Sequence, residues 1–184
     1  GSNPGGLYQD TLTGVKWYIK WPNEDMLRNE ILAQRLYAAA GVEVPEVRLI
    51  QFNGRPAIAS RVIDGLTAEP DLLRAGRVTG VQEHFAVDAW LANWDVVGLS
   101  YDNLKVLAGR GIRIDPGGSL RFRAQGGLKG AAWGDDVLEI DSLRNPGTNS
   151  QAASVFAHVT DADMVDGVRR ILAIPDERIR ELVD

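Results

Sequence analysis

The spacing of apolar and polar residues near the start of the chain indicates a β-hairpin followed by a helix. Residues 7–21 alternate around a turn at 10–14, and the second strand ends in Lys20 on its polar face. Residues 24–40 instead carry apolar side chains at helical spacing, with Asn23 as a cap before them. Gly41 then favours a helix end.

The rest of the pattern predicts an α+β protein. Two strands near 46–52 and 57–62, joined by a turn at Asn53 and Gly54, complete a β-β-α-β-β order in the first third. From residue 63 onward helical patterns dominate, and they are interrupted by two short strands around a turn at 109–111. We expect these later helices near 82–93, 136–143, 151–157, 161–172 and 176–183, and the short strands near 104–107 and 112–114.

Composition narrows the functional classes. With 184 residues and 45% hydrophobic content, the chain fits one compact unit or two packed lobes that share a cleft. The net charge of −5 argues against a general nucleic-acid binder, so we expect no DNA contact. The absence of cysteine excludes disulfides and thiolate sites.

Hydropathy and the beginning of the chain set the remaining expectations. No apolar run approaches the roughly 20 residues that a membrane span requires. No signal peptide is recognisable, and we expect a cytoplasmic protein. The chain begins without Met and enters a glycine-rich stretch at once, which suggests a domain of a longer protein.

Two features of the first third could bind phosphate groups. The run at residues 1–6 includes Gly5 and Gly6, and glycines let backbone amides approach phosphates closely. Lys20 follows at a strand end, and Glu30 can reach it if the helix packs beside the sheet. A lysine held by a carboxylate is a stable cation for nucleotide phosphates. The alternatives are an irregular terminus and a solvated strand lysine.

Several short motifs together resemble a known family. In the first half, an apolar-Lys-aromatic-Pro strand end at 18–22, Asn-Glu at 29–30, and a helix that ends in Ala-Gly before Val-Pro resemble the N-terminal lobe of HipA-type bacterial serine/threonine kinases. In the second half, residues 92–95, 101–104 and 114–117 resemble the Asn-x-Asp, Asn and Asp core of HipA-type and phosphatidylinositol kinases.

The resemblance implies a bilobal protein-kinase-like fold, with an N-lobe at 1–62 that contains one helix and a mainly helical C-lobe at 63–184. It implies binding of ATP with Mg²⁺ and transfer of phosphate to a protein hydroxyl. In this assignment Lys20 contacts the phosphates, Glu30 holds Lys20, and Asp95 is the catalytic acid that positions or deprotonates the acceptor. Asn103 and Asp115 would be the metal ligands, since hard oxygen donors suit Mg²⁺.

The sequence also departs from the family pattern. Asp95 and Asn103 are further apart than the usual separation of about five positions, and residues 96–101 contain no Lys, Arg or His. Related kinases carry a basic residue there; Lys16, Lys105 and Arg123 are conceivable substitutes.

These departures leave other functions open. A non-catalytic pseudokinase module is one alternative, and a nucleotidyltransferase or lipid kinase with the same fold is another. The plainest interpretation makes Asp95, Asn103 and Asp115 ordinary turn residues.

Overall fold

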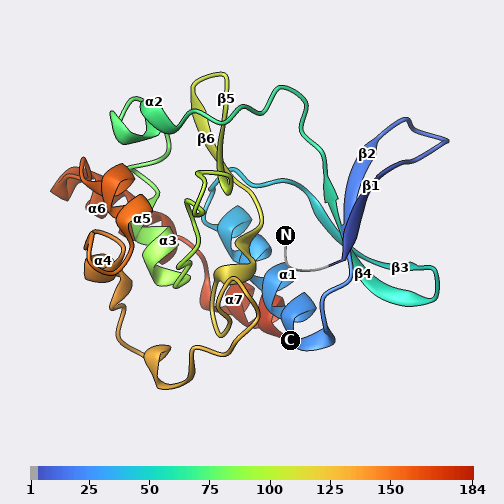
Figure 1. The fold of residues 1–184 in the computed structure, drawn as a ribbon. Helices are drawn as coiled ribbons and strands as arrows, with labels where there is room; N and C mark the ends of the chain where they lie inside the picture. Colours follow the sequence, from blue (N-terminus) through green and yellow to red (C-terminus); the bar gives the residue numbers. More distant parts are fainter. Residues whose placement is uncertain (1–3) are drawn as a thin grey trace.

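The computed structural model describes residues 4–184 and shows an α+β fold with a small antiparallel sheet and several helices (Figure 1). Four strands form the main sheet in the order β1-β2-β4-β3. Their bounds are Gly5–Gln9 for β1, Lys16–Lys20 for β2, Val47–Phe52 for β3 and Arg55–Arg61 for β4. Both predicted hairpins are therefore confirmed, and they are joined edge to edge by the pairing of β2 with β4.

Helix α1, Glu24–Ala39, begins and ends where the sequence predicts. The Asn23 side chain accepts a hydrogen bond from the Met26 amide at 2.9 Å, which satisfies one of the free donors of the first turn. Gly41 has a positive φ of 71°, which a glycine adopts without strain. Leu27 and Ile31 pack on Ile58 of β4, so α1 lies against the sheet.

The second half contains short elements separated by irregular chain. Its helices are α2 (Pro70–Arg74), α3 (Phe85–Trp90), α4 (Glu139–Ser142), α5 (Ser150–Phe156), α6 (Asp161–Leu172) and α7 (Asp176–Val183). Strands β5 (Leu104–Leu107) and β6 (Arg110–Arg113) form a separate hairpin, and two 3-10 turns, η1 (Pro116–Gly118) and η2 (Gly130–Ala132), complete the list. Within residues 4–184, no helix is long and apolar enough to cross a membrane.

Four details of this half differ from the sequence-based expectation, and one is that the helix expected at 136–143 is only α4, Glu139–Ser142. The helix expected at 82–93 is only α3, because Ala92 takes a positive φ of 48° that no helix continues through. The turn expected at 109–111 is centred on Ala108 and Gly109, and Arg110 already pairs with Leu107 in the sheet. The short helix α2 was not predicted.

Helix α1 connects the sheet to the helices of the second half. Leu36 and Tyr37 pack in one apolar cluster with Val87 of α3, with Leu91 just after α3, and with Leu182 of α7. In Figure 1 the sheet lies on the right and α2–α6 lie on the left, with α1 and α7 between them. Segments from both halves of the sequence therefore meet along α1.

A buried ion pair fixes the point at which three elements meet. Arg113 of β6 donates from Nε and Nη2 to the two carboxylate oxygens of Asp88 in α3, at 2.9 and 2.6 Å. Tyr37 of α1 donates its hydroxyl to Asp88 at 2.8 Å, and the Asn93 side chain donates to Tyr37 at 3.0 Å. Both charged side chains are almost fully buried, and such a pair is stable only when its hydrogen bonds are satisfied.

Asp88→Asn is expected to lower the free energy of unfolding by about 3–5 kcal/mol, because it leaves the Arg113 cation buried without a counter-charge. The matched control is Glu43→Gln, which removes the carboxylate partner of Arg110, also in β6, from a half-exposed pair. We expect that change to cost less than about 1 kcal/mol. Urea denaturation of both variants measures the difference, and equal losses would contradict the role given to Asp88.

Candidate functional site

The structure brings together three of the residues singled out from the sequence. Lys20 Nζ lies 2.6 Å from Oε1 of Glu30 and 2.7 Å from Oδ1 of Asp115. Lys20 is the last residue of β2, Glu30 is in the middle of α1, and Asp115 follows β6. The ammonium and Glu30 are buried, whereas the Asp115 carboxylate is half-exposed. Lys20 therefore has one buried partner, Glu30, and one partner that solvent can reach, Asp115.

Burial and charge act in opposite directions within this cluster. Burial raises the pKa of Glu30 to about 7, although the nearby Lys20 cation lowers it. Burial also tends to lower the pKa of Lys20, but the attraction of Glu30 and Asp115 outweighs this effect and raises it. Lys20 consequently remains a cation at neutral pH.

Asp95 and Asn103 form a second pair beside this cluster. The Asn103 side-chain nitrogen donates to the Asp95 backbone carbonyl at 2.9 Å and to Oδ2 of Asp95 at 2.8 Å. Burial raises the pKa of the Asp95 carboxyl; the Asn103 hydrogen bond lowers it, and the charges of Asp102 and Asp115 raise it again.

The backbone of η1 connects the two groups. A Cβ placed on Gly118 would lie 3.0 Å from Cβ of Asp95. A Cβ placed on Gly117 would lie 3.4 Å from carboxylate oxygens of both Asp115 and Glu30. Glycines at these positions let the loop pass closely between the pairs. The two groups are therefore neighbours at η1 and together form the candidate site: Lys20, Glu30 and Asp115 in one group, Asp95 and Asn103 in the other.

Gly5 and Gly6 lie in strand β1, where they pair with Lys20 and Ile19. A Cβ on Gly5 would come within 2.8 Å of the Tyr18 hydroxyl, so packing already explains a glycine there. Gly5 lies beside Lys20. The contact of Gly5 with phosphates stays a prediction. Residues 1–3 of the predicted glycine-rich site lie outside the described residues.

A buried lysine, Lys129, connects the loops of the site by hydrogen bonds, and the sequence analysis did not identify it. Lys129 Nζ donates to the carbonyls of Ala92, Gly118 and Leu120, at 2.5, 2.9 and 2.8 Å. Its ammonium also lies 4.8 Å from the centre of the Trp94 ring. Burial lowers the pKa of Lys129 to about 7. In the sequence it is one cation in a glycine-rich loop, and no local pattern distinguishes it from a solvated charge.

Asn29 provides a further link, and the sequence indicated it only as part of a motif. Its side-chain nitrogen donates to the Ser119 carbonyl at 2.9 Å, and its oxygen accepts from the Arg121 amide at 3.2 Å. The residue next to Glu30 thus holds the chain just after η1. Helix α1 contacts the site through two consecutive side chains.

Of the three conceivable substitute cations, one contacts a residue of the site region. The Arg123 guanidinium lies 5.5 Å from the centre of the Trp94 ring. Lys16 is at the opposite end of β2 from Lys20, and Lys105 is in β5, where it pairs with Ile112. None of the three forms an ion pair with Asp95 or Asp115 in the described part of the chain.

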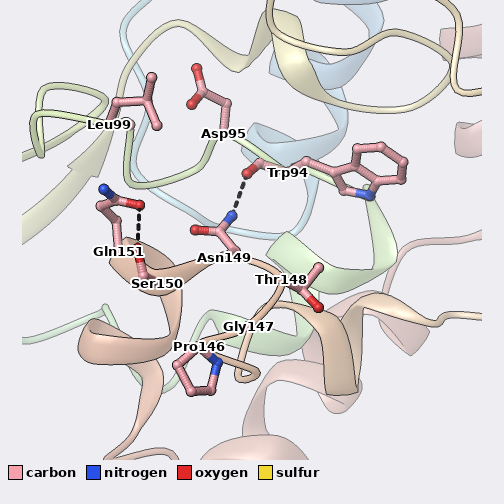
Figure 2. Close-up of a pocket in the computed structure, with 10 residues that line it drawn as sticks. Trp94, Asp95, Leu99, Pro146, Gly147, Thr148, Asn149, Ser150 and Gln151 are labelled. Atoms are coloured by element: carbon pink, nitrogen blue, oxygen red, sulfur yellow. Dashed lines mark hydrogen bonds between the residues drawn. The ribbon is translucent and has the colours of Figure 1, made fainter.

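A cavity of about 290 Å³ lies beside Asp95 (Figure 2). Figure 2 shows Leu99, Asp95 and Trp94 on one side of it and the segment 146–151 on the other. The Asn149 side chain crosses between the two sides by donating to the Trp94 carbonyl at 2.8 Å. The cavity is lined by Trp94, Asp95, Gly98, Leu99, Pro146, Gly147, Thr148, Asn149, Ser150 and Gln151.

The donor set is suited to a hard cation that also binds phosphate. Asp115 supplies a half-exposed carboxylate, and the Asn103 side-chain oxygen is not used in the bonds to Asp95. Among residues 4–184 there is no group of three or more His, Cys, Asp or Glu that could hold a metal alone. Two oxygen ligands fit Mg²⁺, which usually completes its shell with water and substrate phosphates.

Comparison with known proteins does not assign the chain to a family. No model of a known protein family matches it, and no curated protein matches it. Its function is therefore inferred from the geometry of the site.

Lys20→Met is expected to destabilise the protein more at pH 8 than at pH 5. Without the cation, the pKa of buried Glu30 rises further above its unfolded value of about 4.5, so the folded state holds a proton that the unfolded state releases. That contribution to stability is present at low pH and is lost as pH rises. We expect a loss of about 3 kcal/mol at pH 8 and a smaller loss at pH 5.

Urea denaturation at the two pH values measures this difference. Lys16→Met is the control, because Lys16 lies on the same strand and face but is exposed, and it should cost less than about 0.5 kcal/mol at both pH values. A Lys20→Met loss that does not change with pH would show that Glu30 does not depend on this cation.

Proposed function

We propose that this chain is a phosphotransferase that uses ATP with Mg²⁺ and has a bilobal kinase-like arrangement, with a protein hydroxyl as acceptor. The observation that carries the proposal is the convergence of Lys20, Glu30 and Asp115 beside the Asp95–Asn103 pair. These residues come from separate parts of the chain. A lysine–glutamate pair next to an aspartate and an asparagine is the set that protein kinases use for phosphoryl transfer from ATP. The resemblance to HipA-type kinases supports the same assignment.

The charge distribution explains how the triphosphate would be held. Lys20 is shared by Glu30 and Asp115, and only Glu30 is buried with it. A phosphate oxygen can replace Asp115 as the second partner of Lys20, while Glu30 keeps the ammonium in place. Asp115 is then free, together with the Asn103 oxygen, to hold the divalent cation. That cation, when bound, neutralises charge on the phosphates.

Asp95 is suited to the acceptor side of the reaction. Its raised pKa makes it a better proton acceptor than an exposed aspartate, and the Asn103 hydrogen bonds fix its orientation. The acceptor oxygen forms a bond to the γ-phosphorus while the bond from that phosphorus to the bridging oxygen breaks. ADP leaves with the electron pair of that bond, and the hydroxyl proton passes to Asp95.

One observation favours a second candidate, a nucleotide-binding module without transfer activity. Residues 96–101 contain no Lys, Arg or His. Lys129, which bonds to the loop that leads to Asp95, has its amino group directed to three backbone carbonyls. A transferring phosphate would therefore be neutralised chiefly by Lys20 and the metal.

ATP with Mg²⁺ is expected to raise the melting temperature of the protein, because a ligand that binds only the folded state stabilises that state. At a ligand concentration of 100 times Kd, the stabilisation is about 2.7 kcal/mol. Asp115→Asn should raise Kd at least about tenfold, since it removes the charge that holds the cation. Asparagine tolerates the positive φ of 51° at this position. Asp135→Asn, at an exposed position, is the control and should bind like the unmodified protein.

An assay with ATP that is labelled at the γ- or the α-phosphate separates the candidate functions. Incorporation of γ-phosphate, and not of α-phosphate, into a hydroxyl supports phosphoryl transfer. Binding without incorporation would favour the module, and α-phosphate incorporation would indicate nucleotidyl transfer. No stabilisation by ATP with Mg²⁺ would overturn the whole proposal.

A further inference from the structure

The cavity beside Asp95 points to the kind of acceptor. We propose that it binds a serine or threonine side chain of a peptide segment whose neighbouring residues are basic. This inference rests on the proposed phosphotransferase function and adds the acceptor site and its charge preference. It depends on the size of the cavity, on the charges around it and on the polar groups of the segment 146–151.

The size and exposure of the cavity favour a peptide over an enclosed small molecule. Its volume of about 290 Å³ is just below the roughly 300–1,000 Å³ of pockets that bury whole ligands. Leu99, at its edge, is 77% exposed, and Gly147 and Thr148 opposite are exposed as well. A short side chain can enter such a cavity while the rest of the peptide crosses the open surface.

The charges near the cavity are negative. Asp95 is the one ionisable residue among those that line it, and the Asp102 carboxylate lies against Gly98, which also lines it. Two basic side chains, Arg123 and Lys129, lie over the Trp94 ring, and Lys20 is paired with Glu30 and Asp115. Figure 2 shows that this ring extends away from Asp95 and Leu99.

These charges select among acceptors. A carboxylate beside the acceptor hydroxyl would be repelled, whereas an Arg or Lys beside it would be attracted. An anionic small molecule is disfavoured for the same reason.

The opposite wall combines a fixed framework with polar groups that remain available. Asn149 is held at both ends, because it donates to the Trp94 carbonyl and accepts from the Ala152 amide. Within residues 4–184, no hydrogen bond occupies the Thr148 hydroxyl or the Gln151 side-chain nitrogen, while the Gln151 oxygen accepts from Ser150. These two groups can bond to the backbone of a peptide that passes over the cavity. In this arrangement the peptide hydroxyl gives its proton to Asp95 as its oxygen bonds to the γ-phosphorus and ADP departs.

The test compares two synthetic peptides with one central serine, flanked either by arginines or by glutamates. With γ-labelled ATP and Mg²⁺, the basic peptide should be phosphorylated with a kcat/KM at least about tenfold higher than the acidic one. Gln151→Lys places a cation on the cavity wall and should reduce this ratio several-fold. Gln51→Lys makes the same substitution at an exposed position of β3 and should leave the ratio unchanged.

The melting-temperature shift with ATP and Mg²⁺, measured on the same variants, distinguishes the possible failures. If the shift is present but the two peptides react equally, or Gln151→Lys behaves like Gln51→Lys, the acceptor inference is wrong and the nucleotide site stands. If the shift is present and neither peptide is labelled, the acceptor is not a serine peptide, and the inference is again overturned. If the unmodified protein shows no shift, the proposed function fails, and the acceptor site fails with it.

Discussion

The buried pair of Asp88 and Arg113 is the constraint on which the arrangement of the second half depends. A lone charge in the interior is far more costly than a paired one, so α3 and β6 cannot separate without a large loss of stability. Tyr37 adds α1 to the same point through its bond to Asp88. The loop to Asp95 leaves this point just after Asn93, and Asp115 follows Arg113 by two residues. The polar residues of the site are thus held close to a rigid base.

Between that base and the site, the backbone is irregular, and side chains replace the hydrogen bonds of regular structure. Ala92, Asp115 and Leu120 have positive φ angles, which are uncommon outside glycine. Lys129 satisfies the carbonyls of Ala92 and Leu120, and Asn29 satisfies the chain after η1. Strained conformations persist only where surrounding contacts determine them, and they gather at sites with a function.

The sequence predicted most of the first half because its signals are local. Strand alternation, the Asn23 cap and the glycine at 41 depend on neighbouring residues, and all reappear in the structure. The contact of Lys20 with Glu30 was anticipated from the sequence, whereas the ion pair of Lys20 with Asp115 was not. Lys129 and Asp88 were not identified, because their roles depend on partners that are distant in sequence. The end of α3 at Trp90, just before the positive φ of Ala92, was missed because no glycine or proline marks it.

The seven positions that separate Glu30 from Tyr37 in α1 correspond to almost two full turns of a helix, at about 100° per residue. Both side chains therefore project from nearly the same side, one toward Lys20 and the other toward Asp88. Insertion or deletion of one residue between them would swing the glutamate by about 100° and shift it by about 1.5 Å. The length of this part of α1 therefore sets the spacing between the two contacts, so related sequences should conserve its length, and should keep apolar residues at its buried positions, such as Ile31 and Leu36.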